Sequence, residues 1–82
     1  MYYVYLIYSE RNDMYYLGQT NNLEDRIKRH NQNRCRFTKN RGLWNLIGYK
    51  MCKSRSEAVL LERRLKGMKD VDLLRNYFIN TA

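Results

Sequence analysis

Five side chains of this 82-residue chain have the types and spacing that chemistry requires: Tyr5, Tyr16, Arg26, His30 and Glu62. Tyr5 lies in the apolar run of residues 2–8, where its hydroxyl must find a partner or reach a groove. Tyr16 lies in the next apolar run, and across a hairpin the two rings can share one face, because strand side chains alternate. Ordinary sheet tyrosines explain the pair equally well, since aromatic residues are common in strands.

Arg26 and His30 are four residues apart, so on a helix they share one face. Arg26 is next to Ile27, at the edge of the expected core, and a guanidinium there suits bidentate binding of a phosphate. For Arg26 alone, a solvated basic helix face is the simpler interpretation. His30 is the only histidine, and the sequence shows no Ser-His-Asp or Cys-His arrangement around it.

Glu62 lies at the edge of the apolar stripe of a predicted helix, where a half-buried carboxylate needs a cation. Lys66, four residues later, can supply it as an ion pair. A hard divalent ion such as Mg²⁺ can also supply it, through carboxylate oxygen and water. The acidic residues show no paired spacing, so a two-metal site is unsupported.

These side chains must be held in place by strands and helices, and the sequence predicts a small set of them. Residues 2–8 read as a strand buried on both faces, hence central in a sheet. A polar turn at 9–13 leads to a second strand at 14–19, which makes an antiparallel hairpin. Asn21 and Glu24 predict the capping box of a first helix. Residues 31–42 predict a basic loop or short irregular helix, and 43–51 a third strand.

The C-terminal third predicts two more helices. Ser54 and Glu57 form a second capping box. Core residues of that helix recur at helical spacing, namely Ala58, Leu61, Leu65 and Met68. A last helix from Asp70 places Val71, Leu74 and Phe78 on one face. We therefore expect one α+β domain over residues 1–82, a three-stranded antiparallel sheet flanked by helices in the order β-β-α-β-α-α.

Sixteen Lys and Arg against eight Asp and Glu leave a net charge of +8. Such a basic domain attracts polyanions, nucleic acid first, although charge kept only for solubility is the alternative. No apolar run is long enough to cross a bilayer and no signal peptide is recognisable, so we expect a cytoplasmic protein without membrane contact. Cys35 and Cys52 are far apart and predict free thiols.

The ordered set of motifs resembles a known family. Val4-Tyr5-Leu6 looks like its "GIY" element and Tyr16-Leu17-Gly18 like its "YIG" element, followed by a stretch from Gln19 to His30-Asn31 and a helix from Glu57-Ala58 to Lys66. The resemblance covers residues 2 to about 69 and is to the GIY-YIG nucleases. It is strongest to short stand-alone members related to the nuclease domain of the excision-repair subunit UvrC and to structure-specific nucleases.

The resemblance implies a role for each motif residue. Tyr5 and Tyr16 would be active-site tyrosines, Arg26 a phosphate clamp, and His30 an auxiliary acid, base or orienting group. Glu62 would be the sole protein ligand of a divalent metal, Mg²⁺ or Mn²⁺. Tyr3 and Val4 replace the Gly and Ile of the first motif, and Gln19 replaces a lysine of the excision-repair members. That last change removes a cation from the site.

We therefore expect a metal-dependent endonuclease that cuts DNA in preference to RNA, by shape and not by sequence, in repair or recombination. The expected nucleic-acid contacts are Gly18, Gln19, Lys28, Arg29, Arg34, Arg36, Lys39, Arg41 and Lys66, with Phe37 or Trp44 stacking on a base. Two alternatives stay open. One is a non-catalytic nucleic-acid-binding module on the same scaffold, and the other is a domain that binds a protein partner, which could also supply specificity.

Overall fold

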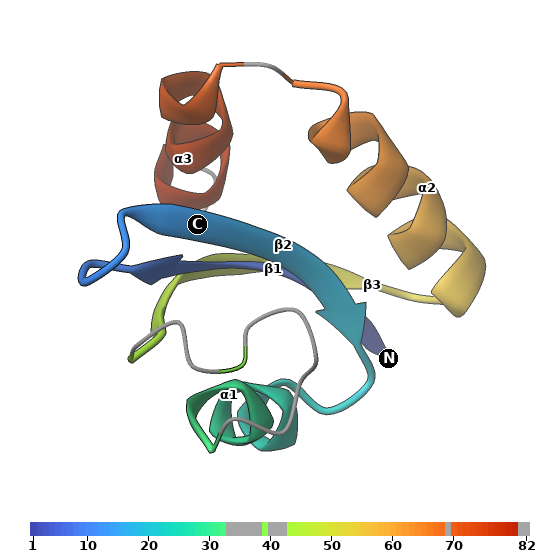
Figure 1. Ribbon diagram of the computed structural model, residues 1–82. Helices are drawn as coiled ribbons and strands as arrows, with labels where there is room; N and C mark the ends of the chain where they lie inside the picture. Colours follow the sequence, from blue (N-terminus) through green and yellow to red (C-terminus); the bar gives the residue numbers. More distant parts are fainter. Residues whose placement is uncertain (33–38, 40–42, 69, 81–82) are drawn as a thin grey trace.

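The computed structural model describes residues 1–32, 39, 43–68 and 70–80 (Figure 1). Its elements follow the predicted order β-β-α-β-α-α, so the α+β prediction is confirmed. They are β1 (Tyr2–Ser9), β2 (Met14–Thr20), α1 (Leu23–Asn31), β3 (Asn45–Cys52), α2 (Arg55–Lys66) and α3 (Val71–Asn80). Of the helices that the structure describes, none is long and apolar enough to cross a lipid bilayer.

The three strands form one antiparallel sheet in the order β2-β1-β3. The apolar run of β1 lies at its centre, and the side chains from Val4 to Ile7 are fully buried. Tyr5 is opposite Gly18 of β2 and opposite Tyr49 of β3. The prediction that the first strand is central is therefore confirmed, because only a strand covered on both faces has no exposed side for apolar residues.

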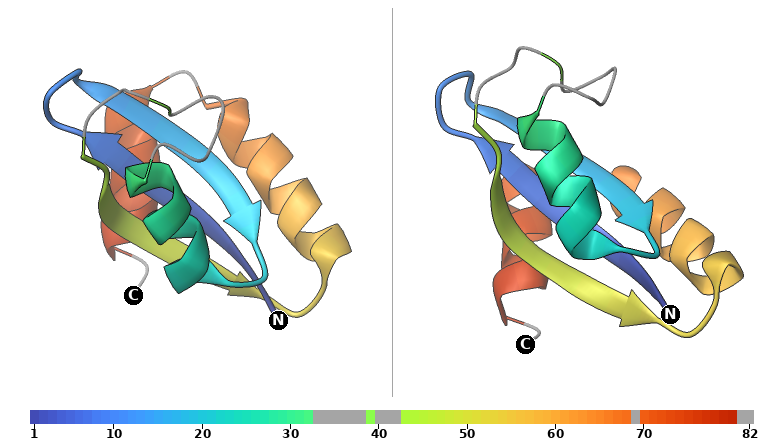
Figure 2. Two further views of the ribbon diagram at one scale, coloured as in Figure 1. Left: turned by 60° about the horizontal axis from the view of Figure 1, so that its bottom comes forward. Right: turned by 90° about the horizontal axis from the view of Figure 1, so that it is seen from below.

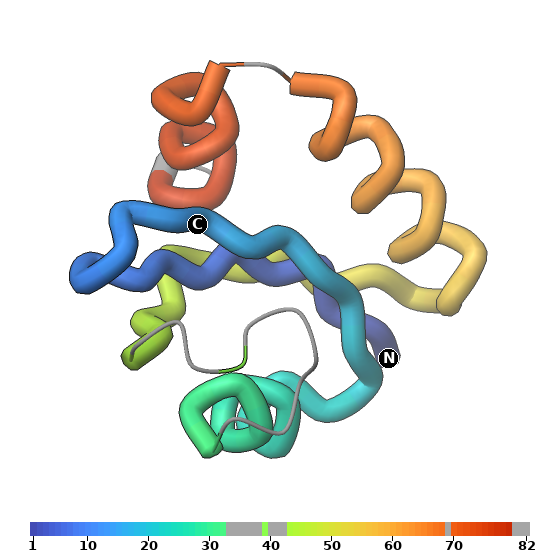
Figure 3. Tube along the Cα trace, viewed as in Figure 1, coloured from blue at the N-terminus to red at the C-terminus, as the bar shows by residue number. Residues whose placement is uncertain are grey.

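Helices cover both faces of the sheet, as Figures 1 and 3 show, with α1 on one side and α2 and α3 on the other. The alternation of β1 divides its side chains between two cores. Tyr5 and Ile7 join Trp44, Tyr16 and the apolar side of α1. Val4 and Leu6 pack against the second core, whose other buried members are Leu17, Cys52, Ala58, Leu65 and Phe78. The face that holds Tyr5 is therefore the α1 face.

The start of α1 differs from the prediction by one residue. Asn22, not Asn21, is the N-cap, and its side-chain oxygen accepts a hydrogen bond from the amide of Asp25 at 3.1 Å. The Thr20 hydroxyl accepts from the Asn22 amide at 3.1 Å, which holds Asn22 in an extended conformation at the end of β2. The predicted capping box of Asn21 with Glu24 is therefore wrong, because the strand end decides which of two asparagines can cap.

The N-cap of α2 is the expected Ser54, but Glu57 binds the amide before the N-cap and not that of the N-cap itself. The Ser54 hydroxyl accepts from the Glu57 amide at 3.2 Å, and the Glu57 carboxylate accepts from the Lys53 amide at 2.8 Å. The core stripe is shorter than predicted, because α2 ends at Lys66 and Met68 lies beyond it, 37% exposed. Val71 is also exposed, so only the later turns of α3 reach the core.

The third strand begins two residues later than predicted, at Asn45. Trp44, just before it, is buried under α1 and belongs to the core of that face. Cys52 is a buried free cysteine, and burial raises the pKa of its thiol. Cys35 lies outside the described residues.

Candidate active site

A buried hydrogen bond joins two of the predicted site residues. The hydroxyl of Tyr5, at the centre of β1, lies 2.8 Å from Nε2 of His30 in the last turn of α1. Tyr5 is fully buried and His30 is 1% exposed. The sheet hydroxyl thus has the partner it requires, supplied by the helix that covers its face.

Tyr16 completes an aromatic group around this bond. Its ring centroid lies 6.4 Å from that of Tyr5 and 5.0 Å from that of His30. Tyr16 is half-buried, so it is the tyrosine of the pair with access to solvent. The register explains the approach, because Tyr16 is two residues from Gly18 on the same strand face and Gly18 is opposite Tyr5. We call Tyr5, Tyr16 and His30 the tyrosine–histidine cluster.

Gly18 provides the space in which these rings meet. A Cβ atom at this position would lie 2.7 Å from Oη of Tyr5 and 2.9 Å from Cε2 of Tyr16. Any side chain here would therefore displace one of the tyrosines. The sequence predicts Gly18 as a nucleic-acid contact, and in the structure the group that lies closest to it is the Tyr5 hydroxyl.

His30 is neutral at physiological pH. Burial, and secondarily the positive charge of Arg26, lower its pKa from 6.5 to about 4. A neutral imidazole has one donor and one acceptor nitrogen, so His30 either donates to the Tyr5 oxygen or accepts from its hydroxyl. Such a ring can orient Tyr5, but it carries no extra proton for a general acid.

Arg26 lies on α1 one turn before His30 and is half-buried. Within the part of the chain that the structure describes, no carboxylate forms an ion pair with it. Its effect on the His30 pKa shows that its charge acts on the tyrosine–histidine cluster. An unneutralised guanidinium at this place suits a phosphate.

Glu62 lies on the opposite side of the sheet, on α2. Its side chain is 19% exposed, and its Oε2 lies 3.0 Å from Nζ of Lys66, so the predicted ion pair is present. Gln19 faces the same side, because it is opposite Val4 in the register and Val4 belongs to the α2 core. Figure 1 shows β2, one of the two edge strands, running between α1 and α2.

A single carboxylate limits the metal that this chain could hold. Within residues 1–32, 39, 43–68 and 70–80, no three His, Cys, Asp or Glu side chains come together as a metal cage. Mg²⁺ does not need one, since it keeps several waters and uses one or two carboxylates together with substrate phosphates. Glu62, mostly buried and already beside a cation, has the chemistry of such a ligand.

The predicted nucleic-acid contacts are spread over the fold. Lys28 and Arg29 are exposed on α1, where Arg29 pairs with Asp25 at 3.1 Å. Lys39 is exposed, and Lys66 pairs with Glu62. Three predicted contacts, Arg34, Arg36 and Arg41, lie outside the described residues, as does Phe37.

Sequence reasoning missed the role of Asn31. Its side-chain oxygen accepts from the Trp44 amide at 2.6 Å, and its side-chain nitrogen donates to the Trp44 carbonyl at 3.1 Å. Trp44 is 3% exposed, and its ring centroid lies 6.4 Å from that of His30. The Trp44 ring therefore packs behind His30, and its burial leaves no free face for the predicted stacking on a base. No periodicity could reveal a bond to a residue thirteen positions away.

Comparison with known proteins bears on the domain as a whole. A family model described as the GIY-YIG catalytic domain matches residues 1–71. Among solved structures, the chain is similar to a UPF0213 protein from Bacillus halodurans determined by solution NMR. The two are 27% identical with a TM-score of 0.54, over 89% of this chain and 79% of that one. A search of curated protein sequences finds no match.

Proposed function

We propose, from the premise that this chain belongs to the GIY-YIG catalytic domain family, that it is a metal-dependent endonuclease that hydrolyses phosphodiester bonds in nucleic acid. Members of this family are endonucleases. The observation that carries the proposal for this chain is the tyrosine–histidine cluster, in which Tyr5, Tyr16 and His30 meet over a glycine. A fold that needed only a core would not require a buried Tyr–His bond there.

The two tyrosines would have different roles. Tyr5 is fully buried and bonded to His30, so it is a positioning residue that orients the cluster. Tyr16 is half-buried, so of the two tyrosines it is the one that substrate and water could reach. Tyr16 would accept the proton of the attacking water, which is general-base catalysis.

Arg26 would bind the scissile phosphate. Arg26 is half-buried, and among the described residues no carboxylate forms an ion pair with it, so its charge is available to a phosphate oxygen. The pentacovalent transition state carries more charge on these oxygens than the ground state, so an arginine in place beforehand lowers the barrier.

Glu62 would hold the divalent ion, Mg²⁺ or Mn²⁺, which when bound would stabilise negative charge on the leaving oxygen. Both Glu62 on α2 and Arg26 on α1 lie on helices that flank β2. A phosphodiester laid across the β2 edge could therefore meet both helices. Lys66, whose ammonium already pairs with Glu62, would have to share that carboxylate with the metal.

A tyrosine base predicts that cleavage speeds up in alkali. A free tyrosine of pKa about 10 is ionised in about one molecule in a thousand at pH 7, a cost of about 4 kcal/mol. Gln19, in place of a lysine, offers no cation to reduce this cost. We expect the cleavage rate to rise from pH 6 to 9, and a flat profile would contradict a tyrosine base.

The substrate we propose is DNA in preference to RNA, selected by its shape, in a cytoplasmic process of repair or recombination. The net charge of +8 supports binding through the phosphate backbone. The sequence shows no recognition-helix motif, which supports a preference for shape over sequence. A protein partner could add specificity to so small a domain.

Cleavage assays with matched variants test this proposal. Branched, nicked and single-stranded DNA would be incubated with Mg²⁺ or Mn²⁺ and with the wild type, Glu62→Gln or Tyr16→Phe. Glu10→Gln, which removes an exposed carboxylate of the hairpin turn, is the control. We expect both site variants to bind DNA but lose cleavage, while the control keeps both activities. A wild type that binds and does not cut would favour the non-catalytic module, an alternative that Gln19 supports.

A further inference from the structure

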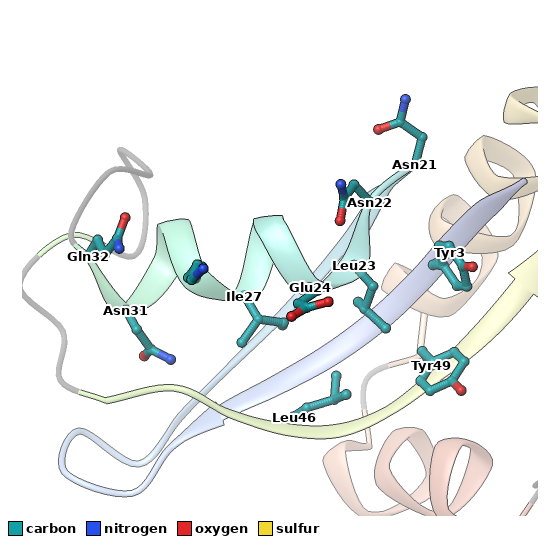
Figure 4. Close-up of a pocket in the computed structure, with 11 residues that line it drawn as sticks. Tyr3, Asn21, Asn22, Leu23, Glu24, Ile27, Asn31, Gln32, Leu46 and Tyr49 are labelled. Carbon is teal, nitrogen blue, oxygen red and sulfur yellow. The ribbon is translucent and has the colours of Figure 1, made fainter.

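A groove separate from the tyrosine–histidine cluster runs between α1 and β3, on the same face of the sheet. Its volume is about 870 Å³ (Figure 4). Leu23 and Ile27 project from α1 toward Leu46 of β3, and Tyr3 and Tyr49 stand at one end. The floor of the groove is therefore apolar, and one of its ends is aromatic.

This groove exposes more apolar surface than packing requires. Tyr49 is 47% exposed and Leu46 is 41% exposed, although both face the side that α1 covers. Tyr49 stands in edge contact with Tyr3, their ring centroids 5.8 Å apart. Figure 2 shows why these side chains of β3 stay exposed: α1 is short and lies nearer the middle of the sheet than the β3 edge.

The rim of the groove is polar and rich in amides. Asn21 and Gln32 lie at its two ends, and both are exposed. Lys28 and Glu24 lie between them on α1, so the charges on the rim balance. An amide carries both a donor and an acceptor, as the edges of nucleobases do.

We propose that this groove binds unpaired nucleobases of the substrate, with Tyr49 as the stacking residue. The inference rests on the proposed function and adds to it a preference for single-stranded segments. An apolar floor with an exposed aromatic ring suits the faces of bases, and the amide rim suits their edges. The whole chain carries +8, so a polyanion is attracted, whereas a second copy would bring +8 against +8.

The dimensions of α1 fit a short strand. Its nine residues make a helix of about 13 Å. At about 3.4 Å per nucleotide, that length matches about four stacked nucleotides. The groove and Tyr16 lie on the same face of the sheet with α1 between them, so a single strand bound in the groove would have to pass over α1 to reach the proposed site.

Binding measurements without added metal ion test the inference separately from cleavage. The probes are a fluorescein-labelled oligothymidylate and a labelled DNA duplex of equal length. Their RNA counterparts, an oligouridylate and an RNA duplex, are compared with them. Binding is followed by fluorescence anisotropy. We expect Tyr49→Ala to weaken single-strand binding about 10-fold, the loss of one stacked base, and to leave duplex binding unchanged. Tyr49→Phe keeps the ring and should restore the affinity.

Ile79→Ala is the matched control, because Ile79 is equally exposed but lies on α3, across the sheet. Single-strand binding that is unchanged in Tyr49→Ala, or reduced equally for duplex and single strand, would overturn the inference. A wild type that sediments as a dimer and becomes monomeric with Tyr49→Ala would also overturn it, and would make the groove a self-interface. Loss of cleavage in Glu62→Gln with normal binding speaks only to the proposed function.

Discussion

Acid should destabilise this fold through its one histidine. In the folded chain the pKa of His30 is about 4, lowered from 6.5 by burial and by Arg26. Between these values the unfolded chain binds a proton that the folded chain does not. The stabilisation is therefore fully present above pH 6.5 and is lost as the pH falls toward 4.

The size of the loss follows from the two pKa values. At 1.36 kcal/mol per pH unit, the complete loss is about 3 kcal/mol, of which about 2 kcal/mol is reached at pH 5. A small domain has a total stability of about 5 to 15 kcal/mol. Protonation of the His30 ring would thus remove a large part of the free energy of unfolding.

The assay is urea unfolding of the wild type and of His30→Gln at pH 7.5 and pH 5, followed by the fluorescence of Trp44, the only tryptophan. Carboxylates titrate in both proteins, so the difference between them isolates His30. We expect the wild type to lose about 2 kcal/mol more than the variant between the two pH values. Parallel losses, or an NMR titration of His30 with a midpoint near 6.5, would refute the reasoning.

Three further predictions follow from the contacts and the charge. Gly18→Ala should cost about 1 to 3 kcal/mol of unfolding free energy, since its Cβ would displace the Tyr5 hydroxyl; an unchanged urea midpoint would contradict this. Asn31→Ala should shift the emission of Trp44 to the red, because both hydrogen bonds that hold its backbone are lost; an unshifted spectrum would show that packing alone holds the ring. Affinity for DNA, measured by anisotropy, should fall steeply with salt, and a salt-independent affinity would sink the electrostatic account of binding.

The sequence alone determined what depends on local pattern. The apolar run of residues 2–8 predicted a central strand, and β1 is central because no other position buries both its faces. Ser54 and Glu57 predicted the start of α2, since a cap needs only residues within one turn. The partial burial of Glu62 and its pairing with Lys66 also followed from helical spacing.

Only the tertiary structure decided which side chains meet. The hydrogen bond from Tyr5 to His30 spans 25 residues, and the hydrogen bonds between Asn31 and Trp44 span 13, so neither leaves a periodic signal in the sequence. The strand register, not the motif, places Gly18 under the Tyr5 hydroxyl and Gln19 on the opposite face. Local spacing fixes where a side chain lies on its own element, but the groups it meets depend on how elements pack. For that reason the sequence could propose the tyrosines and the glutamate as site residues, but it could not show that the tyrosines face α1 while the helix that carries the glutamate lies across the sheet.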